Sequence, residues 1–247
     1  MKTGKGTEVT VGCDPEFFLM LDGTPVSAHD IVPGSKQQPY KIPCGAVQCD
    51  GTAVEFNINP ASTPEEFVSN IDTVLGHLRK KIPKKYEFAF VPEVTYSTKY
   101  WDSLPEECKQ IGCDPDYNYG VIRKPVNLHP TCIAGGHIHI GYSWANYFDK
   151  NHLNHCNSIT NILNHKVDYA RWQKHGARHN SVTMNVYRPK TYGVEIRGFS
   201  NEWLNHREIW PEIFGAAIES VSVLERNLGS CPEIVAPTKF FNNYKAK

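Results

Sequence analysis

Two histidines in the segment at residues 135–141 are the side chains with the clearest chemical potential in this sequence. The segment reads Gly-Gly-His-Ile-His-Ile-Gly and contains His137 and His139. Alternation of His with an apolar residue has the period of a β-strand, which predicts that both His point to one side and both Ile to the other. Paired imidazoles favour a metal or phosphate site, although a buried neutral pair would satisfy the same pattern.

Three glutamates lie inside apolar segments that read as strands, where a carboxylate is costly to bury. They are Glu16 before Phe-Phe-Leu-Met, Glu55 within Ala-Val-Glu-Phe and Glu195 within Gly-Val-Glu-Ile-Arg. Each carboxylate needs a cation or several hydrogen-bond donors there, unless it faces solvent on a half-exposed strand. Together with the two histidines, the three glutamates favour a metal cage. Oxygen ligands with little sulfur favour a hard cation, Mg²⁺ or Mn²⁺.

Arg197 lies two residues after Glu195, so a strand would place both on one face. The glutamate could then hold a metal while the guanidinium binds a phosphate or carboxylate in a bidentate manner. A local ion pair between the two is the alternative. The sequence contains neither a P-loop, nor Gly-x-Gly-x-x-Gly, nor Gly-x-Ser-x-Gly. The phosphates of a bound nucleotide would therefore depend on metals and arginines.

The elements that position these residues begin with two predicted β-hairpins, at residues 17–28 and 47–58. Their turns are expected at Asp22-Gly23 and Asp50-Gly51. A helix is predicted from Thr63, because Thr-Pro-Glu-Glu forms a capping box and apolar residues follow at helical spacing. Further strands are expected at 86–91, 132–142 and 192–198, and further helices at 149–173 and 211–227, the last ending near Gly229.

Residues 96–131 are rich in Pro, Asp and Tyr and are predicted to be an irregular loop insertion. Such an insertion either binds substrate or merely extends the surface. It contains Gly-Cys-Asp-Pro-Asp-Tyr from Gly112, which resembles Gly-Cys-Asp-Pro-Glu-Phe from Gly12. The two copies are either acidic loops that converge on one site or two ordinary turns.

Composition excludes several classes of protein. The 247 residues are 40% hydrophobic, and 26 basic residues balance 26 acidic ones, so nothing indicates bulk nucleic-acid binding or a membrane surface. No apolar run reaches the roughly 20 residues that span a bilayer, and no signal peptide is recognisable, which predicts the cytoplasm. We expect a single catalytic domain with its core at roughly 8–230 and a polar tail at 231–247. The eight Cys form no C-x-x-C pair and are expected to be reduced; a structural zinc site is the alternative.

Four motifs occur in an order that resembles a known superfamily. They are Asp14-x-Glu16, Val-Glu-Phe-Asn-Ile-Asn-Pro around Glu55, Gly-His-Ile-His ending at His139, and Glu195-x-Arg197. The set resembles the glutamine synthetase/glutamate–cysteine ligase superfamily of carboxylate–amine ligases, above all the compact phage-type COOH–NH2 ligases. The likeness spans roughly residues 10–205. It implies an α+β fold in which a curved, mostly antiparallel sheet forms a funnel with helices packed on its outer face.

The resemblance also implies an activity. The chain would form an amide from a carboxylate and an amine through an acyl phosphate, using ATP and Mg²⁺, with Mn²⁺ as an alternative cation. The substrates would be small molecules or peptides, and the setting would be the cytoplasm of an infected bacterium.

The resemblance also implies a role for each of several residues. The implied metal ligands are Asp14, Glu16, Glu55, His137 and Glu195; the implied nucleotide contacts are His139, Arg188 and Arg197; and the implied catalytic residues are Arg197, Glu55 and Glu195. Larger members carry a further acid before the one matching Glu55. Asp50 is the nearest candidate, but Asp-Gly is also an ordinary hairpin turn. Asp114, Asp116 and Tyr117 are candidate ligands of a cationic amine substrate.

Two other functions fit parts of this pattern. A zinc or manganese hydrolase would use the two histidines and a glutamate to activate water, although no His-Glu-x-x-His is present. A catalytically inactive relative would bind nucleotide or a partner protein without turnover.

Overall fold

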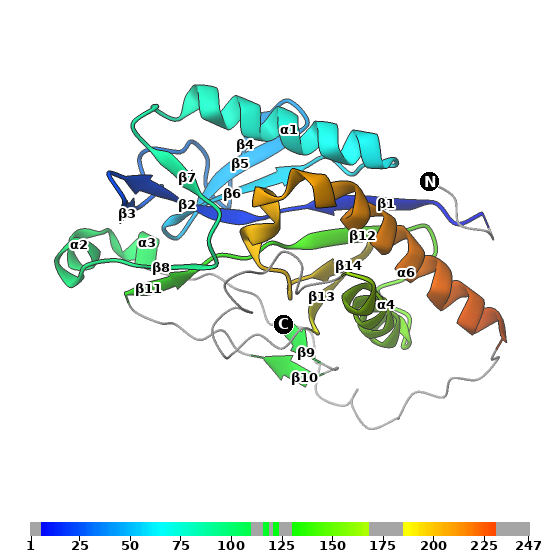
Figure 1. Cartoon of the computed structure of the whole chain (residues 1–247). Helices are drawn as coiled ribbons and strands as arrows, with labels where there is room; N and C mark the ends of the chain where they lie inside the picture. The colour runs from blue at the N-terminus through cyan, green and yellow to red at the C-terminus, as the bar shows by residue number, and fades with distance from the viewer. Residues whose placement is uncertain (1–5, 110–115, 119–120, 124–129, 168–184, 231–247) are drawn as a thin grey trace.

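The computed structural model describes residues 6–109, 116–118, 121–123, 130–167 and 185–230, which form an α+β fold (Figure 1). One six-stranded sheet has the order β1 (Val9–Cys13), β12 (Ile138–Tyr142), β14 (Gly193–Ile196), β13 (Val186–Lys190), β9 (Asp116–Asn118) and β10 (Val121–Arg123). The other has the order β3 (Thr24–Val26), β2 (Glu16–Leu21), β6 (Ala53–Ile58), β5 (Gly45–Asp50) and β4 (Tyr40–Ile42), with β7 (Glu87–Ala89) also paired to β2. β8 (Glu93–Thr95) pairs with β11 (Thr131–Ile133), and all these named strand pairs are antiparallel.

The two large sheets meet where β1 continues into β2. Asp14 and Pro15 alone separate the two strands. The backbone N–H of Asp14 donates to the carbonyl of His137 at 3.2 Å, and that of Glu16 donates to the carbonyl of Gly135 at 2.8 Å. The acidic motif at the start of the chain is therefore held directly beside the histidine segment.

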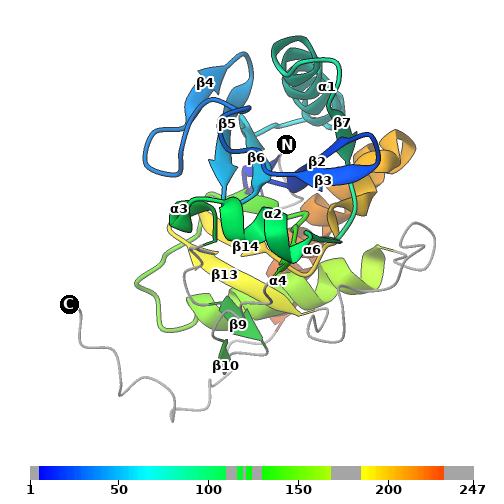
Figure 2. The ribbon, with the colours of Figure 1, turned by 90° about the vertical axis from the view of Figure 1, so that its left-hand side faces the viewer.

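Three long helices cover one face of these strands. They are α1 (Pro64–Lys81), α4 (His152–Lys166) and α6 (Trp210–Ser230), and α6 contacts both of the others. Figure 2 shows them in succession along one side of the strands, from α1 at the top to α4 below. Fully buried side chains of β12 and β14, Ile138, Ile140, Val194 and Ile196, belong to the core with residues of these helices. Because strand side chains alternate, the residues between them point to the opposite face.

Smaller elements lie on the side of β2 and β6 that carries Phe18 and Ala53. These are the β8–β11 pair and two short helices, α2 (Thr98–Ser103) and α3 (Glu106–Lys109). Phe18, Tyr96 and Trp101 form the centre of a second, smaller hydrophobic cluster there. Two 3₁₀ helices, η1 (Asn201–Asn205) and η2 (Arg207–Ile209), connect β14 to α6.

Local chemistry accounts for the best-predicted elements. The β2–β3 turn has Asp22 at φ 50° and Gly23 at φ 75°, as a tight hairpin of this kind requires. Helix α1 begins after Thr63, whose hydroxyl accepts a hydrogen bond from the N–H of Glu66 at 3.1 Å. The β5–β6 turn consists of Gly51 and Thr52, because Asp50 is the last residue of β5 and pairs with Ala53. The expected turn at Asp50-Gly51 was thus one residue too early.

Several sequence predictions were wrong in extent. Residues 96–131 are not a plain loop, since they include α2, α3 and the β9–β10 hairpin. The expected strand at 132–142 is two strands, β11 and β12, because the chain bends at Gly135 and Gly136 to bond with Ser200 and Phe199. Helix α4 begins at His152 and ends at Lys166; residues 168–173 of the expected helix lie outside the described part.

Helix α6 includes Gly229 and does not end before it. A single glycine costs a helix only about 1 kcal/mol relative to Ala, which tertiary packing readily offsets. The polar tail at 231–247 lies outside the described residues. In the described part of the chain the strands form open sheets and no closed barrel. The mostly antiparallel α+β class is confirmed, whereas the funnel stays an implication of the resemblance.

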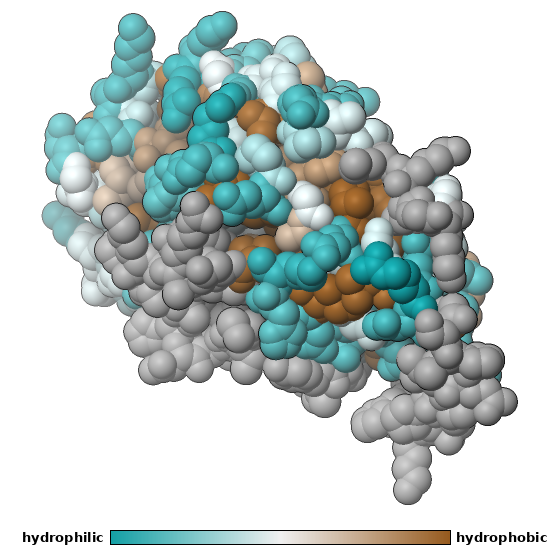
Figure 3. Space-filling view, turned by 45° about the vertical axis from the view of Figure 1, so that its right-hand side comes forward, coloured by the Kyte–Doolittle hydropathy of each residue, from teal (hydrophilic) through white to brown (hydrophobic). Residues whose placement is uncertain are grey.

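Figure 3 shows a face on which hydrophilic side chains predominate, with smaller hydrophobic areas between them. Among the described helices, none combines the length and the apolar character needed to cross a bilayer.

Candidate metal and phosphate site

A row of cross-strand neighbours in the first sheet brings together residues from four strands. His139 in β12 lies opposite Gly12 in β1 and Glu195 in β14, and Glu195 lies opposite Arg188 in β13. Facing residues in neighbouring antiparallel strands have Cβ atoms about 5 Å apart. The register of the sheet therefore groups side chains that are far apart in sequence.

Asp14, His137, His139 and Glu195 form what we call the histidine cluster. Asp14 Oδ1 lies 2.7 Å from His139 Nε2 and 3.3 Å from His137 Nδ1, and Glu195 Oε1 lies 3.9 Å from His137 Nδ1. Both imidazoles thus face the same carboxylate, and the prediction that they share a side is confirmed. His137 immediately precedes β12, so its position depends also on the bend at Gly136.

The histidine cluster fits a divalent cation. Asp14, His139 and Glu195 each offer one ligand atom, and these atoms lie within 4.8 Å of one another. Asp14 Oδ1, His137 Nε2 and His139 Nε2 are buried and have no hydrogen-bond partner of good geometry in the described part of the chain. Buried polar atoms normally have such a partner. A metal ion coordinated by oxygen and imidazole nitrogen would supply it.

The cluster keeps its carboxylates ionised. Burial alone would raise the pKa of Asp14, but the positive charges of His139 and His137, which face it, hold that pKa well below its usual range. Burial and the charge of Asp14 both raise the pKa of Glu195. The cations of Arg197, His137 and His139 outweigh them and lower that pKa to about 2. Both groups are therefore acceptors at neutral pH.

Three cations converge on the Glu195 carboxylate. Arg197 contacts Oε1 directly, Lys190 Nζ lies 2.7 Å from Oε2, and Arg188 Nη1 lies 3.3 Å from Oε1. Sequence reasoning named the two arginines and missed Lys190. The same period of two that relates Glu195 to Arg197 relates Arg188 to Lys190 in β13, and that spacing was the available signal.

Glu16, Asp50 and Glu55 form a second group, the carboxylate trio. Glu55 in β6 lies opposite Glu16 in β2 and Gln48 in β5. One oxygen from each of the three carboxylates lies within 4.8 Å of the other two. The structure thus brings Asp50, which sequence left open between a turn and a metal site, to Glu16 and Glu55.

The trio carries more negative charge than its neighbours offset. Burial, followed by the charges of Asp14, Glu16 and Asp50, raises the pKa of Glu55 to about 9. Gln48 Nε2 donates to Glu55 Oε2 at 2.9 Å, the Gly135 N–H donates to Glu16 Oε2 at 2.7 Å, and Lys36 Nζ lies 3.5 Å from Asp50 Oδ2. A bound divalent cation would relieve the remaining repulsion, because it favours the ionised form of every ligand.

Of the three predicted amine ligands, Asp114, Asp116 and Tyr117, the structure places the side chain of Tyr117 alone. The Tyr117 ring stacks on Tyr187 with centroids 6.0 Å apart, and the Tyr187 hydroxyl donates to the carbonyl of Leu153 in α4. Tyr117 therefore lies on the helix side of the sheet, away from the two clusters. Asp116 is the first residue of β9, but its side chain lies outside the described part, as does the whole of Asp114.

A cavity of about 410 Å³ adjoins the histidine cluster. Its walls include Asp14, His139, Ile58, Pro60 and Tyr192. The Tyr192 hydroxyl contacts His139 Nδ1, a contact that sequence reasoning did not anticipate. Gly12 and Gly141 also line the cavity, and a Cβ on Gly141 would come within 2.7 Å of Thr10 Oγ1. An aromatic ring, aliphatic side chains and an imidazole thus border one concave space.

Comparisons with known proteins add a weak likeness of fold. No protein-family model and no curated protein matches the sequence. A solved GmaS/ADP complex is similar in structure, with a TM-score of 0.41 and 13% sequence identity. The match covers 89% of this chain and 56% of the GmaS chain, so this chain spans about half the length of that protein.

The arrangement is suited to binding a polyanion through cations. Two groups of side chains that can each hold a divalent ion adjoin the β1–β2 junction, and three basic side chains lie beside one of them. Sites for phosphoryl transfer need such charges, since they must offset several anionic oxygens at once.

Proposed function

We propose that this protein is an ATP-dependent carboxylate–amine ligase that forms an amide bond through an acyl phosphate. The observation that carries the proposal is the meeting of the histidine cluster, the carboxylate trio and three cations on one face at the β1–β2 junction. Protein sites that bind Mg²⁺ through few carboxylates commonly complete its coordination with phosphate oxygens. The ordered motifs that resemble the carboxylate–amine ligases supply the reaction class.

The two clusters and the basic side chains would have different roles in this reaction. Asp14, His139 and Glu195, whose ligand atoms lie within 4.8 Å of one another, would hold one divalent cation with His137 beside them, and the carboxylate trio would hold another. A divalent cation at either place supplies neutralisation of phosphate charge. Arg188, Lys190 and Arg197 would contact the phosphates directly, with Arg197 at the γ-phosphate.

The cavity beside His139 supports a nucleotide in particular. Tyr192 offers an aromatic face, and Ile58 and Pro60 offer aliphatic walls to a planar base. Its position next to the histidine cluster would leave the triphosphate over the cations. A base in this cavity and phosphates at Arg197 would be parts of one ligand.

The protein's own groups would act mainly by charge and position. As the substrate carboxylate attacks the γ-phosphorus, negative charge spreads over the transferring oxygens, and Arg197 and Arg188 would offset it. Glu55 and Glu195 would contribute by fixing where the cations lie. An amine would then displace phosphate from the acyl group.

A turnover assay tests the proposal. We expect the pure protein, incubated with ATP, Mg²⁺ and a pool of carboxylic acids and amines, to release ADP only when a particular acid–amine pair is present. Glu195→Gln and Arg197→Ala should each lower turnover at least about a hundredfold, as loss of a charge-stabilising group does. Arg207→Ala is the matched control, because Arg207 forms an exposed ion pair with Asp72.

The outcomes separate the alternatives. ADP and amide formation that the two site variants abolish would support the ligase. Tightly bound zinc without affinity for nucleotide would indicate a hydrolase. Nucleotide binding without ADP release from any pair would indicate a relative that has lost turnover.

A further inference from the structure

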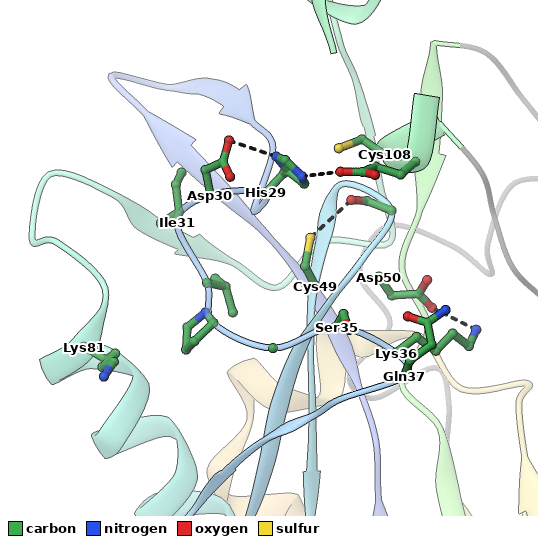
Figure 4. Close-up of a pocket in the computed structure, with 15 residues that line it drawn as sticks. His29, Asp30, Ile31, Ser35, Lys36, Gln37, Cys49, Asp50, Lys81 and Cys108 are labelled. Carbon is green, nitrogen blue, oxygen red and sulfur yellow. Dashed lines mark hydrogen bonds and ion pairs between the residues drawn. The ribbon is translucent and has the colours of Figure 1, made fainter. Parts of the chain in front are cut away.

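A second cavity, of about 700 Å³, lies beside the turn of the β5–β6 hairpin (Figure 4). Its walls come from the segment at residues 29–37, the end of β5, the end of α1 and helix α3. This volume falls within the range of roughly 300–1,000 Å³ typical of small-molecule sites. None of the residues that line it was singled out from the sequence as a substrate ligand.

The cavity and the carboxylate trio share Asp50. Asp50 lines the cavity and also places an oxygen within 4.8 Å of ligand atoms of Glu16 and Glu55. A group bound to Asp50 from the cavity would therefore lie beside the proposed reaction centre. This makes the cavity a candidate entrance for a substrate.

The Asp50 end of the cavity accepts an ammonium group. Lys36, which also lines the cavity, places Nζ 3.5 Å from Asp50 Oδ2. The Lys36 side chain is 49% exposed and that of Asp50 19% exposed. Ion pairs at such a surface contribute little to stability, so the ammonium of a ligand can replace that of Lys36.

The opposite end offers a cation. Lys81, at the end of α1, lies 4.9 Å above the Tyr40 ring and contacts the Tyr40 hydroxyl at 3.4 Å. No carboxylate of the described residues lies within ion-pair distance of its Nζ. Figure 4 shows Lys81 and Asp50 on opposite sides of the residues drawn. A ligand that meets both must carry its two charges far apart.

The wall between these ends is not a further cation site. His29 Nδ1 lies 3.0 Å from Asp30, and His29 Nε2 lies 2.8 Å from Glu107, so these two acids share an internal partner. Ile31, Val32 and Pro33 contribute apolar surface. The cavity thus pairs an anion at one end with a cation at the other, with both polar and apolar surface between them.

We propose that this cavity binds a short peptide, with its N-terminal ammonium at Asp50 and its C-terminal carboxylate at Lys81, as the amine substrate of the ligase. The assignment rests on the proposed function. In the reaction the peptide nitrogen forms a bond to the carbon of the acyl phosphate, and the bond from that carbon to the phosphate oxygen breaks. An acyl phosphate and a peptide ammonium thus give an amide, HPO₄²⁻ and one proton.

Binding measured without ATP tests the cavity alone. The probes are alanine and alanine peptides of two to five residues, each with free termini, with an N-terminal acetyl group or with a C-terminal amide, titrated by calorimetry. We expect acetylation to weaken binding at every length. Amidation should weaken it, by about fivefold, only at lengths that reach Lys81. Lys81→Gln should produce the same loss for free peptides and none for amidated ones, whereas Lys80→Gln, the neighbouring exposed lysine outside the cavity, should change neither.

Equal affinities of free and capped peptides, or an unchanged affinity in Lys81→Gln, would overturn the assignment. A second measurement, ADP release with ATP, Mg²⁺, a carboxylate pool and the best peptide, separates it from the proposed function. Peptide binding that depends on Lys81 but yields no ADP would refute the ligase and leave the peptide site standing. ADP release with free amino acids, unaffected by Lys81→Gln, would refute the peptide site and leave the ligase standing.

Discussion

Replacing Glu55 by Gln should stabilise the metal-free protein at neutral pH, because burial and the neighbouring carboxylates disfavour the ionised form of this side chain. Its pKa is 4.5 when unperturbed and about 9 in the folded protein. Between these values the folded state holds a proton that the unfolded state has lost, so the free energy of unfolding falls as pH rises from 4.5 to 9. pH 7 lies about 2.5 units above the unperturbed pKa, and each unit corresponds to about 1.4 kcal/mol. At pH 7 the raised pKa of Glu55 therefore lowers the free energy of unfolding by about 3 kcal/mol.

Glutamine keeps the size of the side chain and carries no charge. Its amide oxygen can still accept the hydrogen bond that Gln48 donates to Glu55 Oε2. Glu55→Gln should therefore recover about 2 kcal/mol, which raises the Tm by roughly 4–8 °C in a chain of this size. The gain should grow as pH rises from 5 to 8.5.

Calorimetric unfolding of EDTA-dialysed wild type and variant over that pH range measures this effect. Glu87→Gln is the control, because Glu87 is exposed in β7 and lies outside the carboxylate trio. Added Mg²⁺ or Mn²⁺ should stabilise the wild type and release a proton from Glu55 at pH 7, detected by titration in buffers of different ionisation enthalpy. A variant no more stable than wild type at pH 8, or one that metal stabilises equally, would refute the proposed destabilisation by Glu55.

Two further substitutions test other parts of the site. Gly136→Ala should lower the free energy of unfolding in urea by about 1–3 kcal/mol, since its Cβ would lie 2.5 Å from the Ser200 carbonyl oxygen. Gly76→Ala in α1, where a Cβ meets nothing within 4 Å, should instead raise the free energy of unfolding. Equal effects of the two substitutions would contradict the proposed steric clash at Gly136. Tyr192→Ala should weaken binding of a fluorescent ATP analogue about tenfold, because it removes the aromatic wall of the cavity. Tyr192→Phe loses only the hydroxyl that contacts His139 and should keep most of the affinity. Equal losses of affinity in both variants would argue against stacking of the base on Tyr192.

Sequence reasoning succeeded where short-range chemistry decides the outcome. The facing of His137 and His139 follows from a period of two, and helix α1 begins directly after Thr63 because the Thr63 hydroxyl accepts a hydrogen bond from the N–H of Glu66. It failed at residues 96–131, where short helices and strands form against distant partners rather than from strong local patterns. Tyr117, expected to bind an amine, packs on Tyr187 because β9 pairs with β13.

Asp50 illustrates the limit of local reading within the site. Asp-Gly is a strong turn signal, yet the turn lies one residue later and the carboxylate joins Glu16 and Glu55. Lys190 and Tyr192 were not selected as site residues, because only the pairing of β13 with β14 and of β14 with β12 brings them to Glu195 and His139.

The amino-acid sequence by itself determined which residue types are present, which of them share a strand face, and where α1 begins, because neighbours along the chain govern these properties. The tertiary structure alone decided that acids from β2, β5 and β6 form one trio, that Lys190 belongs beside Glu195, and that cavities flank both clusters. These features depend on strand register and on the joining of two sheets at β1 and β2, which are set by contacts between residues far apart in the chain.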